Sequence, residues 1–436
     1  MRFLKQEQRK VSTFQLQKMP MISYERFELK NGLRVLVHED QSTPMAAVNL
    51  LYNVGARDES PEKTGFAHLF EHLMFGGSLN ISDFDEQIQL AGGDSNAFTN
   101  NDMTNFYTTL PAANLETAFW LESDRMLQLK LTPKALETQR RVVIEEFKET
   151  CLNQPYGDVW HHLSDLAFRI HPYRWPAIGL IPQHVEEATL DDVREFFDTY
   201  YCPNNAILSI AGPVKSADIR RLAEKWFGDI PAGAIPLRQL PQEPPQQQLQ
   251  QRIQRANVPV DALYLAFHTP ARDHTDYYAV DLLSDILCNG NSSRLYRRLL
   301  KEQQLVNAID AYITGNIDPG LLIIEAKTRE GISLETAEAA IWKELERLQN
   351  QAISKRELAK YINKVESTLI FSETNVLNKA MNLAFFELLD DVDLINTEAE
   401  AYARVTTADI QRVAQQILTR ENCSELYYLA GSGDGF

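Results

Sequence analysis

The 436-residue sequence has few cysteines and no long apolar runs. Its four cysteines, Cys151, Cys202, Cys288 and Cys423, are scattered and form no CxxC pair, which argues against a thiolate zinc site and a dense disulfide framework. We therefore expect reduced, mostly buried thiols. No apolar run reaches the ~18 to 20 residues that span a bilayer, so we expect no transmembrane segment.

A secretory leader is also not visible, because the basic start, residues 1–18, is not followed by an apolar core. We therefore expect a cytoplasmic protein, or a periplasmic one if a leader has been removed. Clustered positive charge is scarce as well, since 60 acidic residues outnumber 43 basic ones and the net charge is −17. This balance argues against nonspecific binding of nucleic acid, which requires clustered Lys and Arg. The acidity either favours basic substrates or only aids solubility.

A segment near the middle of the chain divides it into two halves. Residues 233–251 are rich in Pro and Gln and show no apolar period, which is typical of an extended linker. We therefore predict an N-terminal lobe over residues 1–232 and a C-terminal lobe over residues 252–436. At 44% hydrophobic content, both halves can bury a core.

Short repeats indicate that the two halves arose by duplication. Ala-Arg-Asp occurs at 56–58 and again at 271–273, and Leu-Glu-Thr-Ala occurs at 115–118 and again at 334–337. Two matches at nearly the same offset suggest one repeated unit with small insertions. Strand-like and helix-like runs alternate in both halves, and Asn31-Gly32 predicts a hairpin. We therefore predict an α+β fold of two homologous lobes, each with a largely antiparallel sheet packed with helices.

Residues 64–78 predict a helix that carries metal-binding chemistry. His68, Glu71 and His72 form the pattern H-x-x-E-H and fall on one side of the helix. Imidazoles at i and i+4 can reach one Zn²⁺, and the carboxylate between them can act as a general base. The opposite side is an apolar stripe: Phe66, Leu69, Phe70, Leu73 and Met74.

A third ligand is expected from a second helix, predicted over residues 135–150. It offers Glu145, Glu146 and Glu149. Glu146 and Glu149 point to one side and Glu145 is turned away, so helical geometry leaves two candidates open.

With these motifs the sequence resembles the pitrilysin family of inverted zinc peptidases, whose signature is H-x-x-E-H. The resemblance covers nearly the whole chain and is similar to the shorter two-lobed members. The family's downstream VVxEE segment corresponds here to residues 142–146. The resemblance therefore implies one Zn²⁺ per chain, held by His68, His72 and Glu146, with Glu71 as the catalytic base and Glu149 beside the ligands.

The family's edge-strand pattern resembles residues 92–107, in which the corresponding residues are Gly92, Gly93, Asn96, Ala97, Thr99, Asp102, Thr104 and Tyr107. In relatives this strand pairs with the backbone of the substrate beside the zinc. The resemblance therefore implies that Asn96, Ala97, Phe98 and Thr99 bind a peptide or an unfolded polypeptide segment.

The sequence departs from the family at three places. A frequent Glu seven residues before the zinc Glu is Gln139 here. The Arg and Tyr of a second-lobe segment like LRxxxGLAY, which bind the substrate carbonyl, are replaced by Leu300 and Asn307. Arg294, Arg297 and Arg298 lie nearby, but none has a Tyr seven residues later.

The second half also has no metal helix of its own. The positions that correspond to the H-x-x-E-H residues are apolar: Leu283, Ile286 and Leu287. An enzyme that lacks the Arg and Tyr would stabilise the oxyanion poorly. We therefore expect a zinc endopeptidase subunit that pairs with a homologous, zinc-free chain carrying the Arg and Tyr, or otherwise a homodimer. The alternatives are a noncatalytic structural subunit of the same fold and, less favoured, a zinc hydrolase acting on a nonpeptide.

Overall fold

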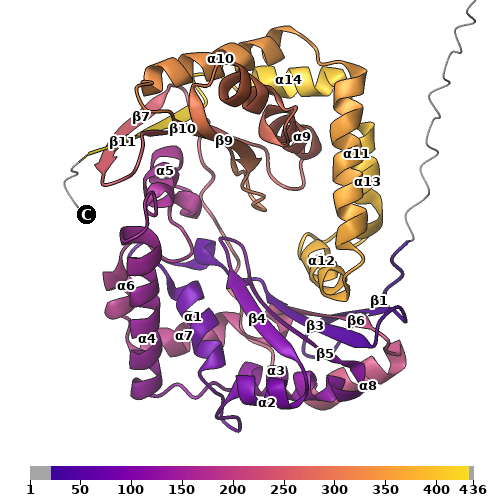
Figure 1. The fold of residues 1–436 in the computed structure, drawn as a ribbon. Helices are drawn as coiled ribbons and strands as arrows, with labels where there is room; N and C mark the ends of the chain where they lie inside the picture. Colours follow the sequence, from indigo (N-terminus) through magenta and orange to yellow (C-terminus); the bar gives the residue numbers. More distant parts are fainter. Residues whose placement is uncertain (1–20, 432–436) are drawn as a thin grey trace, which may run out of the picture.

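The first sheet of the computed structural model has six strands and carries the predicted substrate strand at one edge (Figure 1). The structure describes residues 21–431, so the basic start at residues 1–18 lies outside it and the cytoplasmic location stays a prediction. The strand order is β1-β2-β6-β3-β5-β4, and only β2 and β6 run parallel. The strands are β1 (Glu25–Glu28), β2 (Arg34–Glu39), β3 (Met45–Tyr52), β4 (Asp94–Thr99), β5 (Thr104–Pro111) and β6 (Ala206–Gly212).

The rest of the first half of the chain forms helices and short turns, most of which pack on this first sheet. The α-helices are α1 (Phe66–Phe75), α2 (Phe84–Leu90), α3 (Leu115–Leu127), α4 (Pro133–Phe147), α5 (Val159–Ala167), α6 (Pro182–Glu186), α7 (Leu190–Tyr200) and α8 (Ser216–Phe227). The short helices are η1 (Ala56–Asp58), η2 (Ala112–Asn114), η3 (Lys148–Leu152), η4 (Pro172–Arg174) and η5 (Pro203–Asn205).

The second sheet repeats the topology of the first without its outermost strand. Its order is β7-β11-β8-β10-β9, and only β7 and β11 run parallel. Its strands are β7 (Gln250–Ala256), β8 (Ala262–His268), β9 (Val306–Ile313), β10 (Leu321–Thr328) and β11 (Cys423–Ala430). The helices of the second half of the chain are α9 (Tyr277–Cys288), η6 (Tyr296–Glu302), α10 (Leu334–Asn350), α11 (Lys355–Ser372), α12 (Val376–Leu388), α13 (Leu394–Arg404) and α14 (Thr407–Ile417). The predicted fold, two α+β lobes with largely antiparallel sheets, is therefore confirmed.

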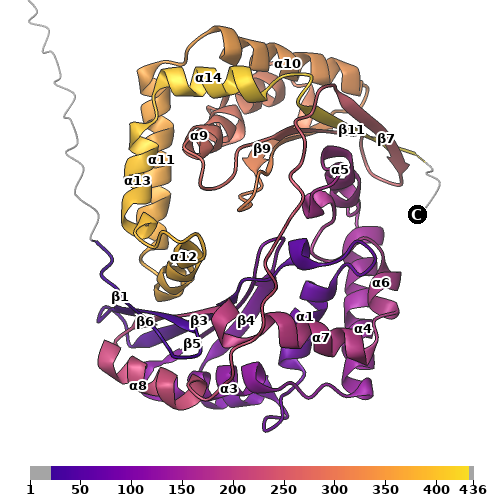
Figure 2. The same cartoon turned by 180° about the vertical axis from the view of Figure 1, so that it is seen from behind.

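The linker runs between the lobes without regular secondary structure, as Figure 2 shows. Strand β7 begins at Gln250, so the last two residues of the predicted linker belong to the second sheet. They join it because β7 pairs in parallel with β11, starting at Gln250 opposite Ser424.

The repeated sequence motifs occupy equivalent places in the two lobes. The two Leu-Glu-Thr-Ala segments begin α3 and α10. In both Ala-Arg-Asp segments the arginine amide donates to the hairpin turn of its own lobe, from Arg57 to Asn101 at 2.9 Å and from Arg272 to Ile317 at 3.0 Å. The two turns also meet each other, because the Ile317 amide donates to Asp102 Oδ2 at 3.0 Å. Duplicated turns therefore form part of the contact between the lobes.

Each lobe lends one helix to the sheet of the other (Figure 1). Helix α5 of the first lobe packs on β7, β8 and β11, where Leu163 and Phe168 join a buried cluster with Tyr264 and Leu426. Helix α12 of the second lobe packs on β2, β3 and β6, and its apolar residues contact both β3 and β6. Neither sheet is therefore covered by its own half of the chain alone.

The four cysteines all lie in the described part of the chain, and each is buried and free of disulfides, as predicted. Among residues 21–431, no helix combines the length and the apolar character that crossing a membrane requires.

Candidate metal centre

Helix α1 is fixed at its start and along its buried side. Its N-cap, Gly65, has a φ of +86°, which favours glycine. The buried carboxylate of Glu59 accepts hydrogen bonds from the amides of Gly65 at 3.0 Å and Ala67 at 2.8 Å. The predicted apolar stripe is buried in the first-lobe core, where Phe70 stacks on Tyr201. These contacts hold the opposite side of the helix in one orientation.

Three side chains from α1 and α4 converge beside this helix. His72 Nε2 lies 3.3 Å from His68 Nε2 and 3.1 Å from Glu146 Oε2, and His68 Nε2 lies 3.7 Å from the same oxygen. Among the described residues, these three form the only group of His, Cys, Asp and Glu side chains positioned to share a metal ion. The structure therefore brings together the three residues that the sequence predicts as zinc ligands.

The spacing of the three ligand atoms fits a tetrahedral zinc ion. Two ligands at ~2.0 to 2.1 Å from a tetrahedral Zn²⁺ are separated by ~3.3 Å, and the three observed separations lie around this value. Burial, reinforced by His72 and opposed by Glu146, lowers the pKa of His68 to about 4. The imidazole of His68 is therefore neutral near pH 7, which is the state that binds a metal.

The structure separates the candidate glutamates that helical spacing alone left open. Glu146 reaches the two histidines from α4, which packs against α1. Glu149 lies one turn later in the π-helix η3, is exposed, and accepts a hydrogen bond from Asn153 at 3.2 Å. Glu145 pairs with Lys148 at 2.7 Å. The ligand role of Glu146 and the supporting role of Glu149 stay predictions, and the geometry favours the first.

Glu71 lies on the same side of α1 as the histidines. Burial raises the pKa of its carboxyl group, while the Thr99 hydroxyl and His72 limit that rise and Glu146 adds to it. A carboxylate with a raised pKa takes up a proton more readily than an exposed one, which suits a general base.

The predicted substrate strand is an edge strand close to the metal ligands. Strand β4 pairs only with β5, so one side of its backbone is free of strand neighbours, and α1 packs beside it. The amide of Ala97 donates to the Asn96 side chain at 2.8 Å. In the second lobe the amide of Ala311 donates to the Asp310 side chain at 2.8 Å in the equivalent edge strand β9. Peptide binding by residues Asn96, Ala97, Phe98 and Thr99 stays a prediction.

The second lobe contains apolar side chains where the first has its metal ligands. Leu283, Ile286 and Leu287 of α9 are fully buried. At the positions expected for the carbonyl-binding Arg and Tyr, Leu300 packs against the second-lobe core, and Asn307 donates to the Thr328 carbonyl at 3.2 Å. Neither side chain supplies the cation or the phenol found in the family pattern.

Two sets of residues near the site were not recognised in the sequence. Glu59, the anchor of α1, follows the first Ala-Arg-Asp motif directly, which was a usable signal. Buried Arg57 pairs with Asp102 at 2.8 Å and with Asp318 of the second lobe at 3.2 Å. In the sequence, the only sign that Arg57 has a role was its position in the repeated Ala-Arg-Asp motif.

Comparisons with known proteins agree with this geometry. Residues 34–179 match the family described as Insulinase (Peptidase family M16), and residues 187–365 match the domain described as Peptidase M16 inactive domain. The chain is 29% identical over 400 residues to the zinc protease PqqE of Helicobacter pylori, covering 90% of each chain. It is 25% identical over 406 residues to a probable mitochondrial-processing peptidase subunit beta of Arabidopsis thaliana, covering 89% of this chain and 75% of the relative.

Solved structures show the same fold. A protease from Helicobacter pylori superposes with a TM-score of 0.90 at 28% identity and covers 94% of this chain and 100% of its own. The periplasmic protease PqqL from Escherichia coli superposes with a TM-score of 0.76 at 17% identity and covers 95% of this chain but only 48% of its own. The present chain thus corresponds in fold to about half of that longer protein.

Proposed function

The chain belongs to peptidase family M16, and on that basis we propose that it is a zinc-dependent endopeptidase that cleaves peptides or unfolded polypeptide segments. The observation that carries the proposal is the convergence of His68, His72 and Glu146 at zinc-ligand spacing, with the buried carboxylate of Glu71 on the same helix. A zinc ion held there would act as a Lewis acid toward the water and the scissile carbonyl.

The protein's own groups do the remaining work in this mechanism. An extended peptide adds to the free side of β4 and forms backbone hydrogen bonds along residues Asn96, Ala97, Phe98 and Thr99. Glu71 takes a proton from the attacking water at its carboxylate and returns it to the leaving amine nitrogen. The raised pKa of Glu71 favours the first of these transfers.

The missing Arg and Tyr lead to the second part of the proposal, a partner subunit. Leu300 has no side-chain donor, and the Asn307 amide already donates to the Thr328 carbonyl, so neither replaces the Arg or the Tyr. The loss of one oxyanion donor typically costs about 2.7 to 4 kcal/mol of transition-state stabilisation. A homologous, zinc-free chain that carries the Arg and Tyr completes the site in a heterodimer. In support, one relative is named as a beta subunit, and the longer Escherichia coli protein has about twice the matched length.

The base is tested with Glu71→Gln, which keeps the shape of the side chain but cannot accept the proton. We expect kcat to fall by about 10² to 10⁴-fold or more, with one zinc per chain retained, measured with a quenched peptide library and by metal analysis. Glu145→Gln is the matched control, since Glu145 lies one residue from a ligand and pairs only with Lys148 among the described residues. Activity that survives in Glu71→Gln would contradict the assignment.

The partner is tested by assaying the purified chain alone and mixed with a homologous chain that lacks H-x-x-E-H and carries the Arg and Tyr. We expect the mixture to cleave peptides about 10²-fold faster or more, because the partner restores oxyanion donors. Equal activity from the chain alone would defeat the heterodimer and favour a homodimer. Absence of both zinc and cleavage would support the alternative of a noncatalytic structural subunit.

A further inference from the structure

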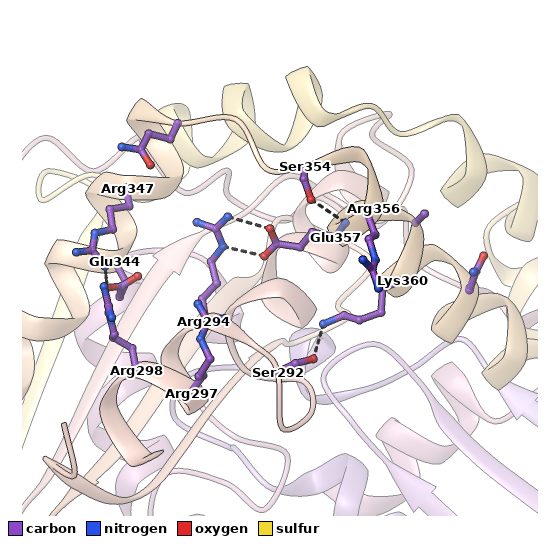
Figure 3. Close-up of a pocket in the computed structure, with 13 residues that line it drawn as sticks. Ser292, Arg294, Arg297, Arg298, Glu344, Arg347, Ser354, Arg356, Glu357 and Lys360 are labelled. Carbon is purple, nitrogen blue, oxygen red and sulfur yellow. Dashed lines mark hydrogen bonds and ion pairs between the residues drawn. The ribbon is translucent and has the colours of Figure 1, made fainter. Parts of the chain in front are cut away.

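An open cleft of about 1280 Å³ lies in the helical layer of the second lobe and is lined by second-lobe residues alone (Figure 3). Its lining contains six cationic side chains but only two carboxylates. The cations are Arg294, Arg297, Arg298, Arg347, Arg356 and Lys360, and the carboxylates are Glu344 and Glu357. This excess of positive charge is local, since the chain as a whole carries a net charge of −17.

The two carboxylates hold several of the arginines in place without neutralising all of them. In the centre of the cleft Arg294 forms a two-point pair with Glu357, at 2.9 and 3.0 Å (Figure 3). On one wall Arg298 and Arg347 share Glu344, and Arg298 also pairs at 2.6 Å with Glu302, which lies outside the lining. These guanidinium groups are therefore already oriented, which lowers the entropy lost when they bind an anion.

The opposite wall carries cations with weaker compensation. Lys360 donates to the Ser292 hydroxyl at 2.8 Å (Figure 3). Within residues 21–431, Arg356 makes no ion pair. Arg297 lies not on this wall but beside Arg298 on η6, and it reaches only Glu302, at 3.5 Å (Figure 3). Burial lowers the pKa of Lys360, and the charges of Lys364 and Arg297 lower it further against the effect of Glu357. The positive end of helix α11, which begins at Lys355, lies on the same wall.

The character of the lining narrows the class of ligand. Ala359 is its only apolar residue, and no aromatic ring lines it. A nucleobase would find no aromatic ring on which to stack. An acidic peptide would find neither apolar pockets nor a free strand edge for its backbone. A chain of phosphoryl groups needs only what the cleft provides, which is guanidinium forks, an ammonium group, hydroxyls and a helix N-terminus.

From this arrangement we propose that the cleft, residues 292–298 with residues 344–363, binds a linear oligophosphate anion of two or more linked phosphoryl groups. The Arg294–Glu357 pair lies in the centre of the cleft, with one group of cations on each side of it. A linear chain of phosphates can therefore contact both groups at once. The site is built from second-lobe residues alone and does not depend on the metal centre.

The probe is sodium tripolyphosphate, titrated calorimetrically into the full-length protein at constant ionic strength, with sodium sulfate as a second ligand. We expect saturable, one-to-one binding of tripolyphosphate and weaker binding of sulfate. The double variant Arg297→Gln/Arg356→Gln removes the two least compensated cations, both exposed, and should weaken binding by about tenfold or more per lost contact. Arg298→Gln/Arg347→Gln removes the two cations that share Glu344 and should have a similar effect.

The matched control is Arg194→Gln/Arg221→Gln, which removes the same charge from two exposed arginines of the first lobe. We expect this control to bind tripolyphosphate as the unmodified chain does. Equal losses in the control and the cleft variants would show a nonspecific charge effect and overturn the site. Lack of saturation at ~1 mM tripolyphosphate would also overturn it. Tighter binding of hexaglutamate than of tripolyphosphate would identify an acidic polypeptide as the occupant and would refute the proposal.

Discussion

At the scale of single residues, the site depends on one carboxylate that contacts both histidines. Glu146 lies 3.1 Å from His72 Nε2 and 3.7 Å from His68 Nε2, whereas Glu149 bonds to Asn153. Both glutamates come from one chain segment, and the family resemblance distinguishes them only by alignment. A measurement of metal content distinguishes them directly.

We expect Glu146→Gln to lose stoichiometric zinc and Glu149→Gln to keep it. An amide at position 146 is a much poorer ligand than a carboxylate, and zinc sites lose affinity when a ligand is removed. Metal analysis after dialysis against a weak chelator gives the result. Loss of zinc from Glu149→Gln with retention in Glu146→Gln would reverse the assignment of the third ligand.

A second prediction concerns Glu425, a buried carboxyl group in strand β11 of the second lobe. Burial, with the neighbouring Glu338, raises its pKa from 4.5 to about 7. Between these values the folded chain holds a proton that the unfolded chain has released, so the contribution of Glu425 to stability falls as the pH rises from about 4.5 to 7. Glu425→Gln should therefore raise the melting temperature by a few degrees at pH 8, relative to the unmodified chain.

The same substitution should have little effect near pH 4, where Glu425 is protonated in both states. Thermal unfolding followed by circular dichroism at the two pH values measures the difference. Glu335→Gln on neighbouring helix α10 is the control, because Glu335 is fully exposed and should show no such gain at pH 8. A gain of equal size at both pH values would show that Glu425 does not titrate in this range.

At the scale of elements, the turn after the substrate strand is held by buried charge. Asp102 follows β4, pairs with Arg57, and accepts hydrogen bonds from the Tyr173 hydroxyl and the Ile317 amide. Burial raises the pKa of Asp102, and Arg57 opposes that shift. The end of β4 is thus tied both to the first lobe and to the β9–β10 turn of the second.

We expect Asp102→Asn to destabilise the fold by about 3 to 5 kcal/mol, because it leaves the Arg57 charge buried without its closest partner. Where the variant still folds, the position of β4 should change and KM for peptides should rise more than kcat falls. Tyr173→Phe removes two neutral-donor hydrogen bonds, one donated to Asp102 and one accepted from the Asp318 amide, and should cost about 1 to 3 kcal/mol. Denaturant unfolding and steady-state kinetics test both. Similar small losses in the two variants would show that the buried ion pair contributes little.

At the scale of the whole molecule, each of the two lobes contributes a helix to the sheet of the other, in addition to the direct contacts between them. Helix α5 covers the second sheet and α12 covers the first, so each sheet needs the other half of the chain to bury its apolar face. This arrangement predicts one cooperative folding unit, despite the linker that separates the halves in sequence.

Leu383→Ala tests this cooperativity. Leu383 lies on α12, is fully buried, and belongs to a cluster with Leu36, Leu51 and Ile207 of the first lobe. We expect a loss of about 2 to 5 kcal/mol and one calorimetric transition at a lower temperature. Leu377→Ala, at a partly buried position of the same helix, should cost less. Two separate transitions in either variant would show that the lobes unfold independently.

The sequence alone determined the elements whose signals are local. The spacing of His68, Glu71 and His72 fixes their angles on one helix, the apolar stripe fixes which side is buried, and the repeated motifs revealed two equivalent lobes. Such features depend on residues a few positions apart, where helix geometry leaves little freedom.

Only the tertiary structure decided which contacts form between elements. It placed Glu146, and not Glu149, beside the histidines, and it paired Arg57 with aspartates of both lobes. It also packed α5 on the sheet of the second lobe and α12 on the sheet of the first. It also gathered the cleft arginines from segments about 50 residues apart in the chain. The physical reason is that these contacts depend on how two surfaces pack, and each surface carries residues that are distant in sequence.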